Sequence, residues 1–119
     1  MARVRRILVG DAGMKYQVSD LSGALLDAAV AKCEGMNYEL RNPGPACVIC
    51  NMAYSPSSHW DTGGPLIERH GIDLTYVHEN DEPWASQVPG DGRIGFGATP
   101  LVAAMRAYVV SMIGYEVDL

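Results

Sequence analysis

The spacing of apolar and polar positions predicts a first helix near the N-terminus. Between Leu21 and Cys33, apolar residues recur at intervals of three and four, which places them on one face of a helix. Ser19 is a suitable N-cap residue, and Gly35 follows as a stop signal. These features predict a helix over residues 20–34.

A second main helix is predicted near the C-terminus. Residues 101–113 are apolar almost all round, with Arg106 as their only charged residue, and Gly114 follows them. Thr99 can cap this helix, and Pro100 fits its first position, where no N–H is needed. A helix without a polar face is expected to be buried in its own domain or in an oligomer interface. We therefore also predict a homodimer through this helix.

Between these helices the pattern predicts a shorter helix and several strands. Pro65 fits the first position of a short helix that ends at Gly71. Strands are predicted at residues 4–9 and 46–52 from their apolar runs, at 72–77 from alternation of apolar and polar residues, and at 93–96 within a long loop over residues 78–97. A polar connector is predicted over residues 36–45, and Trp84 and Phe96 are expected to anchor the long loop to the body.

These elements predict an α+β fold in a single small domain. Two main helices and one short helix would pack on a small, mostly antiparallel sheet. The length of 119 residues fits one domain, and 48% apolar with 19% charged residues is a globular composition.

Composition and charge then limit the class of protein. No apolar run approaches the roughly 20 residues that cross a bilayer, and no secretory signal is recognisable, so we expect a cytoplasmic protein without membrane contact. Three cysteines cannot all pair within one chain, which fits a reducing compartment. The net charge of −5 argues against non-specific DNA binding, although Arg3, Arg5 and Arg6 make the N-terminus basic.

Several stretches, taken in order along the chain, are similar to the phage NinX-like proteins, which are small proteins of bacteriophages and prophages. The similar stretches are residues 16–23, 29–35, 54–57, 60–69 and 99–106. The resemblance implies a phage or prophage protein in the cytoplasm of its bacterial host, but the family brings no established activity. It also implies a NinX-like domain over residues 14–119, with residues 1–13 as an N-terminal extension.

The two predicted helix starts that contain glycine and proline, at residues 63–65 and 97–100, make the strongest candidate site. Glycine lets a ligand approach the backbone closely, and free N–H groups at a helix start attract anions. A tryptophan could stack on a ligand and an arginine could supply charge. The candidate ligand-binding residues are therefore Trp60, Gly63, Gly64, Glu68 and Arg106. The alternative is that these glycines and prolines only make ordinary turns and caps.

Arg106 stands alone on an apolar helix, so it should have a partner if it is buried, because an unpaired buried charge costs several kcal/mol. Glu68 and Asp27 are candidate partners, and a structural ion pair is the favoured interpretation.

Two other patterns suggest chemistry but lack essential parts. Cys47 and Cys50 form C-x-x-C near His59, but a zinc site needs about four ligands, and two cysteines at this spacing on a strand face opposite sides. We therefore expect buried cysteines, no metal and no cofactor. The serines at 55, 57 and 58 neighbour His59 and Asp61 in sequence, which is not the geometry of a catalytic triad, so they are expected to cap a turn.

The sequence leaves two functions open and does not decide whether the protein is an enzyme. The first is a non-enzymatic accessory protein that contacts a phage or host protein, which should present an exposed apolar patch and no enclosed polar pocket. The second is a small anionic-ligand or nucleotide-binding protein, which should gather Trp60, Glu68 and Arg106 around one concave site.

Overall fold

The computed structural model describes residues 14–41 and 46–119. This part of the chain contains three α-helices and three small antiparallel sheets, which confirms the predicted α+β class. The helices are α2 (Gly23–Cys33), α3 (Trp60–His70) and α4 (Pro100–Met112), and one turn of 3-10 helix, η1 (Val18–Asp20), precedes α2. The strands are β1 (Lys15–Gln17), β2 (Glu39–Arg41), β3 (Ala46–Ile49), β4 (Met52–Ala53), β5 (Thr75–Tyr76), β6 (Trp84–Ser86), β7 (Gly95–Gly97) and β8 (Glu116–Asp118).

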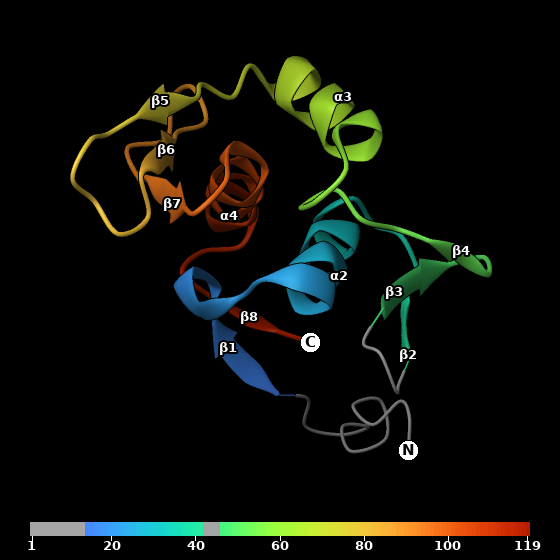
Figure 1. Ribbon diagram of the computed structural model, residues 1–119. Coiled ribbons are helices and arrows are strands. Elements are labelled where there is room, and N and C mark those ends of the chain that lie inside the picture. Colours follow the sequence, from blue (N-terminus) through green and yellow to red (C-terminus); the bar gives the residue numbers. More distant parts are fainter. Residues whose placement is uncertain (1–13, 42–45) are drawn as a thin grey trace.

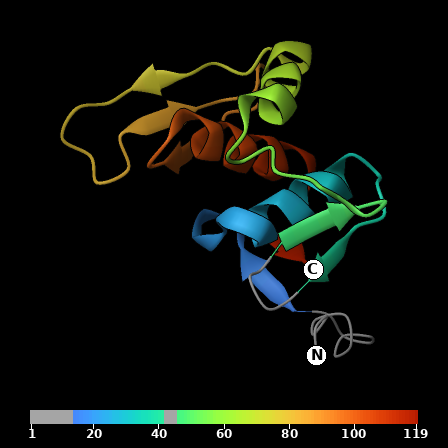
Figure 2. The ribbon, with the colours of Figure 1, turned by 45° about the vertical axis from the view of Figure 1, so that its right-hand side comes forward.

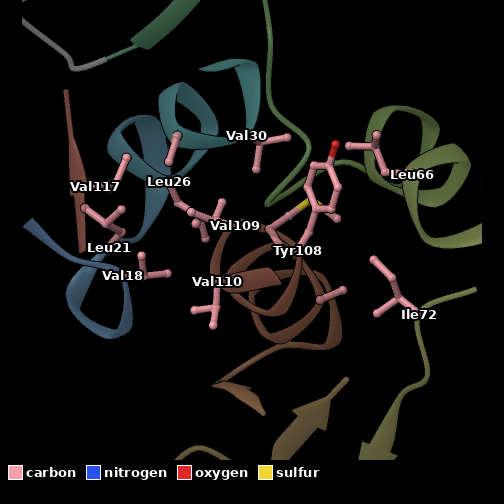
Figure 3. Close-up of a cluster of buried hydrophobic side chains, with 13 residues drawn as sticks. Val18, Leu21, Leu26, Val30, Leu66, Ile72, Tyr108, Val109, Val110 and Val117 are labelled. Carbon is pink, nitrogen blue, oxygen red and sulfur yellow. The ribbon is translucent and has the colours of Figure 1, made fainter. Parts of the chain in front are cut away.

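Helix α4 lies at the centre of the molecule (Figure 1), where α2, α3 and strands β6 and β7 pack around it. Figure 2 shows the order of the layers: the β5–β6–β7 sheet, then α4, then α2, then the β2–β3–β4 sheet. The buried cluster around α4 includes Val30 from α2, Leu66 from α3, and Tyr108 and Val109 from α4 itself (Figure 3). The apolar surface of α4 is therefore covered largely by its own chain. Burial within the domain was one of the two expectations for a helix without a polar face.

The ends of α4 follow the sequence pattern. The Thr99 Oγ1 atom accepts a hydrogen bond of 3.2 Å from the N–H of Val102, and Pro100 occupies the first helical position. Gly114 follows the helix with a φ of 123°, a backbone conformation that side chains disfavour.

The β5–β6–β7 sheet packs on α4 through two glycines. A Cβ atom at Gly95 would stand 2.5 Å from the backbone nitrogen of Ala107, and one at Gly97 would stand 2.6 Å from that of Ala103. The strand therefore rests directly on the helix backbone. Phe96, between the two glycines, faces the opposite side of the sheet and is exposed, so the prediction that Phe96 anchors this loop is wrong.

The other two sheets are equally small. Strands β1 and β8 pair in antiparallel fashion and bring the first and last described residues together, with a hydrogen bond of 2.9 Å from the N–H of Leu119 to the carbonyl of Met14. Strands β3 and β4 are joined by a two-residue turn at Cys50 and Asn51, both with positive φ, the geometry that fits the twist of a tight hairpin. The single small sheet that the pattern predicted is thus three separate sheets.

The predicted start of the first helix is wrong by three residues. Residues 18–20 form the 3-10 turn η1, and α2 begins only at Gly23, after an N-cap at Ser22. Gly23 has a φ of 57°, which a continuous right-handed helix from Asp20 could not accommodate. Ser19 is therefore not the N-cap.

The predicted start of the short helix is also wrong. Helix α3 begins at Trp60, so Gly63, Gly64 and Pro65 lie inside it, and it is as long as α2. Proline inside a helix removes one N–H, here the one that the carbonyl of Asp61 would accept. The predicted end is confirmed, because Gly71 is the C-cap with a φ of 64°.

Strand lengths differ most from the prediction. Strands β1, β2, β6 and β8 were not predicted, the strand over 72–77 is reduced to β5, and the strand over 46–52 is split by the hairpin turn. The predicted strand over 4–9 lies outside the described residues, as does the Asn42–Pro45 part of the connector.

Candidate functional site

A pocket of about 360 Å³ lies where the first turns of α2, α3 and α4 meet. It opens to solvent, its lining is mainly apolar, and no lining residue carries a charge. The lining residues are Gly23 from α2, Ser57, Ser58 and Trp60 at the start of α3, and Thr99, Pro100, Leu101 and Val102 at the start of α4. Three helix starts that are far apart in sequence therefore share one concave surface.

The α3 side of the pocket is shaped by a tight turn. The carbonyl of Ser55 accepts hydrogen bonds from the N–H groups of Ser58 (3.1 Å) and His59 (2.9 Å), and α3 begins at the next residue. Trp60 is the first residue of the helix and is 53% exposed. An exposed indole thus stands at the edge of an apolar pocket.

A buried carboxylate joins this turn to α2. Asp27 is only 4% exposed, and its Oδ1 atom accepts a hydrogen bond of 2.8 Å from the N–H of Ser57. Burial raises the pKa of Asp27 above its ordinary value, although the hydrogen bonds from Ser57 and the nearby His59 oppose that effect. Asp27 lies one turn after Gly23 on α2, so its hydrogen bond joins this part of α2 to Ser57 of the pocket lining.

The α3 and α4 sides of the pocket meet at Gly63. A Cβ atom there would overlap the carbonyl oxygen of Pro56 and would stand 2.7 Å from the Cδ2 atom of Leu101. Gly63 therefore allows the two helix starts to approach each other. Gly64 has no such restriction, since the nearest atom to a Cβ there is Cε3 of Trp60 at 3.9 Å.

Of the five predicted ligand-binding residues, Trp60 lines the pocket and Gly63 and Gly64 lie beside it on α3. Glu68 lies two turns further along α3 and is not part of the lining, and Arg106 is not part of it either. The contribution of Gly23 was not predicted, because its only local signal is a glycine after a serine near the start of the first helix.

Arg106 is buried and makes its hydrogen bonds within the fold. Its guanidinium donates to the carbonyls of Leu21 (3.0 Å) and Phe96 (2.7 Å) and to the Oε2 atom of Glu82 (2.8 Å). It is buried and paired, as its apolar surroundings predict, but its partner is neither Glu68 nor Asp27. The loop before β6 brings Glu82 across to α4, whereas Asp27 accepts from Ser57 instead.

A second cluster of polar side chains joins the helices away from the pocket. The Glu34 carboxylate accepts hydrogen bonds from the hydroxyl of Tyr108 and, at 2.5 Å, from Nη2 of Arg69. The ring of His70 lies 4.6 Å from that of Tyr108. Burial alone would raise the pKa of Glu34, but the hydrogen bonds outweigh it and hold the pKa below the ordinary value. This cluster ties the ends of α2 and α3 to the middle of α4.

The structure forms neither a metal site at the cysteines nor a catalytic triad at the serines within the described residues. Cys47 is buried in β3, but Cys50 is exposed in the hairpin turn, so the prediction of buried cysteines is wrong for Cys50. Within residues 14–41 and 46–119, no three His, Cys, Asp or Glu residues lie close enough to hold a metal ion. The Oγ atom of Ser58 lies 3.1 Å from Nδ1 of His59, but the Asp61 carboxylate accepts from its neighbour Thr62.

No arginine of the described residues lines the pocket. Each arginine in the described part of the chain forms an ion pair with a carboxylate: Arg41 with Glu39, Arg69 with Glu34, Arg93 with Asp91, and Arg106 with Glu82. A phosphate in the pocket would therefore meet no cation among the described lining residues.

These features define a small α+β domain with an open apolar pocket at the meeting point of three helices. A protein-family model described as Bacteriophage P22, NinX matches residues 17–112. The match covers more than half of the chain, so the chain belongs to this phage NinX family, which confirms the resemblance seen in its sequence and supports a phage accessory protein. No match is found among curated proteins.

No helix in the part of the chain that the structure describes is long and apolar enough to cross a bilayer.

Proposed function

We propose that this phage accessory protein is a non-enzymatic module that binds a phage or host protein in the bacterial cytoplasm. The pocket beside Trp60 receives an apolar side chain of that partner. The exposed indole at the mouth of an apolar pocket is the observation that carries this proposal. Tryptophan is enriched among the residues that dominate binding energy at protein interfaces, especially where it adjoins a pocket that can be desolvated.

The chemistry of the lining supports an apolar occupant. Pro100, Leu101 and Val102 supply hydrocarbon surface, and burial of such surface stabilises a complex by roughly 25 cal/mol per Å². The polar side chains in the lining include the hydroxyls of serine and threonine. Such groups are typical of the polar rim of a protein interface and supply no charged catalytic group.

A small anionic ligand is the second candidate, and one observation favours it. Three helix starts, where N–H groups without helical partners gather, border the same pocket, and the N-caps of α2 and α3 make no side-chain capping hydrogen bond. Against it, Pro100 lacks an N–H, and no cation lines the pocket. The balance favours a protein partner.

Affinity capture from phage-infected host cells tests the proposal when pocket variants are compared. Trp60→Ala removes the indole, and Val102→Phe fills the pocket. Met52→Ala is the matched control, since Met52 is 71% exposed on β4 and lies outside the pocket lining. We expect a protein that the wild type and Met52→Ala retain and that both pocket variants lose.

Two other results would count against the proposal. A protein retained equally by all four forms would contradict binding through the pocket. Stabilisation of the wild type by a nucleotide or a phosphorylated metabolite, lost in Trp60→Ala, would favour the second candidate instead.

A homodimer through the C-terminal helix stays a separate prediction. The residues of α4 and its C-cap that remain exposed are mainly Met112 and Ile113, so a dimer of this kind would use the end of the helix. Light scattering on Met112→Lys beside the wild type would test it: a monomer for the wild type contradicts the prediction.

A further inference from the structure

Three aromatic side chains contact one another beside the loop that joins β5 and β6. The ring of Tyr76 lies 5.3 Å from that of Trp84 and 5.0 Å from that of His78, in both cases edge to face. Tyr76 and Trp84 are also direct partners across the two strands. Because Tyr76 is 51% exposed, this group of rings is held in place and still offers aromatic surface to solvent.

The loop itself is acidic. Between His78 and Trp84 it carries Glu79, Asp81 and Glu82. Glu82 pairs with Arg106, which ties the base of the loop to α4, whereas Glu79 and Asp81 are exposed and form no ion pair with the described residues. Figures 1 and 2 both show this loop, in yellow, projecting beyond the rest of the molecule.

The described residues offer this loop no free arginine. Three of the nine basic residues and one of the 14 acidic residues lie within residues 1–13, which leaves six basic against thirteen acidic residues elsewhere. Every described arginine is already paired with a carboxylate. Glu79 and Asp81 therefore remain available to the positive charge of a partner.

We propose that Tyr76, His78, Glu79, Asp81 and Trp84 form a docking surface for an arginine- or lysine-containing segment of a partner protein. Aromatic faces attract cations through their quadrupole, and carboxylates beside them accept the N–H donors of the same cation. A guanidinium fits this combination best, because it is planar and can stack while it donates. This surface is separate from the pocket beside Trp60, so the inference goes beyond the proposed function and does not need it.

A peptide titration tests the proposal with the intact chain. The probe is a six-residue arginine peptide, and a six-residue glutamate peptide is the comparison. The two tryptophans give separate indole N–H signals in a two-dimensional NMR spectrum, so the place of binding is visible. We expect the arginine peptide at about 20 mM salt to move the Trp84 signal in a saturable manner, more weakly at about 200 mM salt, and the glutamate peptide to leave it unmoved.

Two double variants then separate a site from general charge attraction. Glu79→Gln with Asp81→Asn should weaken binding about tenfold, whereas Glu68→Gln with Glu116→Gln removes the same charge elsewhere and should weaken it less than about threefold. Tyr76→Leu should also weaken binding, by about threefold. Equal weakening by both double variants, movement of the Trp60 signal in place of the Trp84 signal, or no shift at low salt would each overturn the proposal.

Discussion

The Oδ1 atom of Asp27 accepts a 2.8 Å hydrogen bond from the backbone N–H of Ser57, and this buried contact joins α2 to the turn that begins α3. Thirty positions separate the two residues in sequence. The bond fixes Ser57 and Ser58 at the edge of the pocket, so the shape of the candidate site depends on a carboxylate that does not line it.

Removal of the Asp27 carboxylate should lower the free energy of unfolding, whereas its replacement by the neutral amide of asparagine should not. Asp27→Ala leaves the Ser57 N–H without a partner inside the protein, so we expect a loss of about 1–3 kcal/mol in the free energy of unfolding. Asp27→Asn keeps an acceptor oxygen and no longer buries a charge, so it should be at least as stable as the wild type at pH 7. Urea unfolding measures both, and an equal loss for the two variants would contradict this role.

The pH dependence of the same pair has a defined sign. Because burial raises the pKa of Asp27 above 3.8, the folded protein takes up this proton at a higher pH than the unfolded chain does. Ionisation of Asp27 therefore lowers stability at neutral pH relative to the protonated form, and this cost disappears as the pH falls toward about 4. The advantage of Asp27→Asn over the wild type should shrink over that range; an advantage that grows toward acid pH would be inconsistent with a buried, raised carboxyl.

The approach of α3 to α4 should depend on one of two adjacent glycines. Gly63→Ala would force a Cβ atom onto the Pro56 carbonyl and Leu101, so we expect a destabilisation of about 1–3 kcal/mol. Gly64→Ala is the matched control, because it adds the same atom in open contact and should stabilise the helix by up to about 1 kcal/mol. Thermal or urea unfolding checks the pair, and similar effects at both positions would refute the close approach.

Glu34 should make the fold sensitive to acid. Its pKa is held below 4.5 by hydrogen bonds from Tyr108 and Arg69, which outweigh burial, so its stabilising contribution is present above about pH 4.5 and is lost as the pH falls through the lowered value. Glu34→Gln should therefore be less stable than the wild type at pH 7 and should lose less stability between about pH 5 and 3. Urea midpoints across this range provide the test, with the exposed Glu68→Gln as a control that should follow the wild type.

Arg106→Lys tests whether Arg106 is structural. Lysine cannot reproduce the fork that reaches the carbonyls of Leu21 and Phe96 together with Glu82, so we expect a loss of about 2–4 kcal/mol in stability. At a temperature where the variant remains folded, it should still capture the same partner as the wild type. If folded Arg106→Lys no longer captured the partner, Arg106 would have a direct role in binding.

Features with a local cause could be predicted from the sequence. Helix α4 followed from its apolar run, the Thr99 cap and Pro100, and the end of α3 followed from Gly71. The start of α3 could not be predicted, because Pro65 resembles a first-position proline and the turn at Ser55 that starts the helix leaves a weaker pattern. Most strands of the three sheets could not be predicted for a similar reason, because strands of two to four residues show almost no periodic pattern.

The site itself depends on contacts between distant parts of the chain. The sequence pointed to Trp60 and to the start of α4, but nothing local indicates that Gly23 meets them. The partner of Arg106 was misplaced for the same reason, since Glu82 lies in a loop whose path only the packing of β6 and β7 on α4 determines.

Site-specific photocrosslinking in phage-infected cells tests the central claim most directly. A photoreactive amino acid at Ser58 would stand in the pocket lining, and the same residue at Met52 would stand on β4, outside that lining. We predict a crosslink to one protein partner from position 58 that is absent from position 52 and that Val102→Phe abolishes. The same crosslinks from both positions, or none from position 58, would contradict the assignment of this pocket as the protein-binding site.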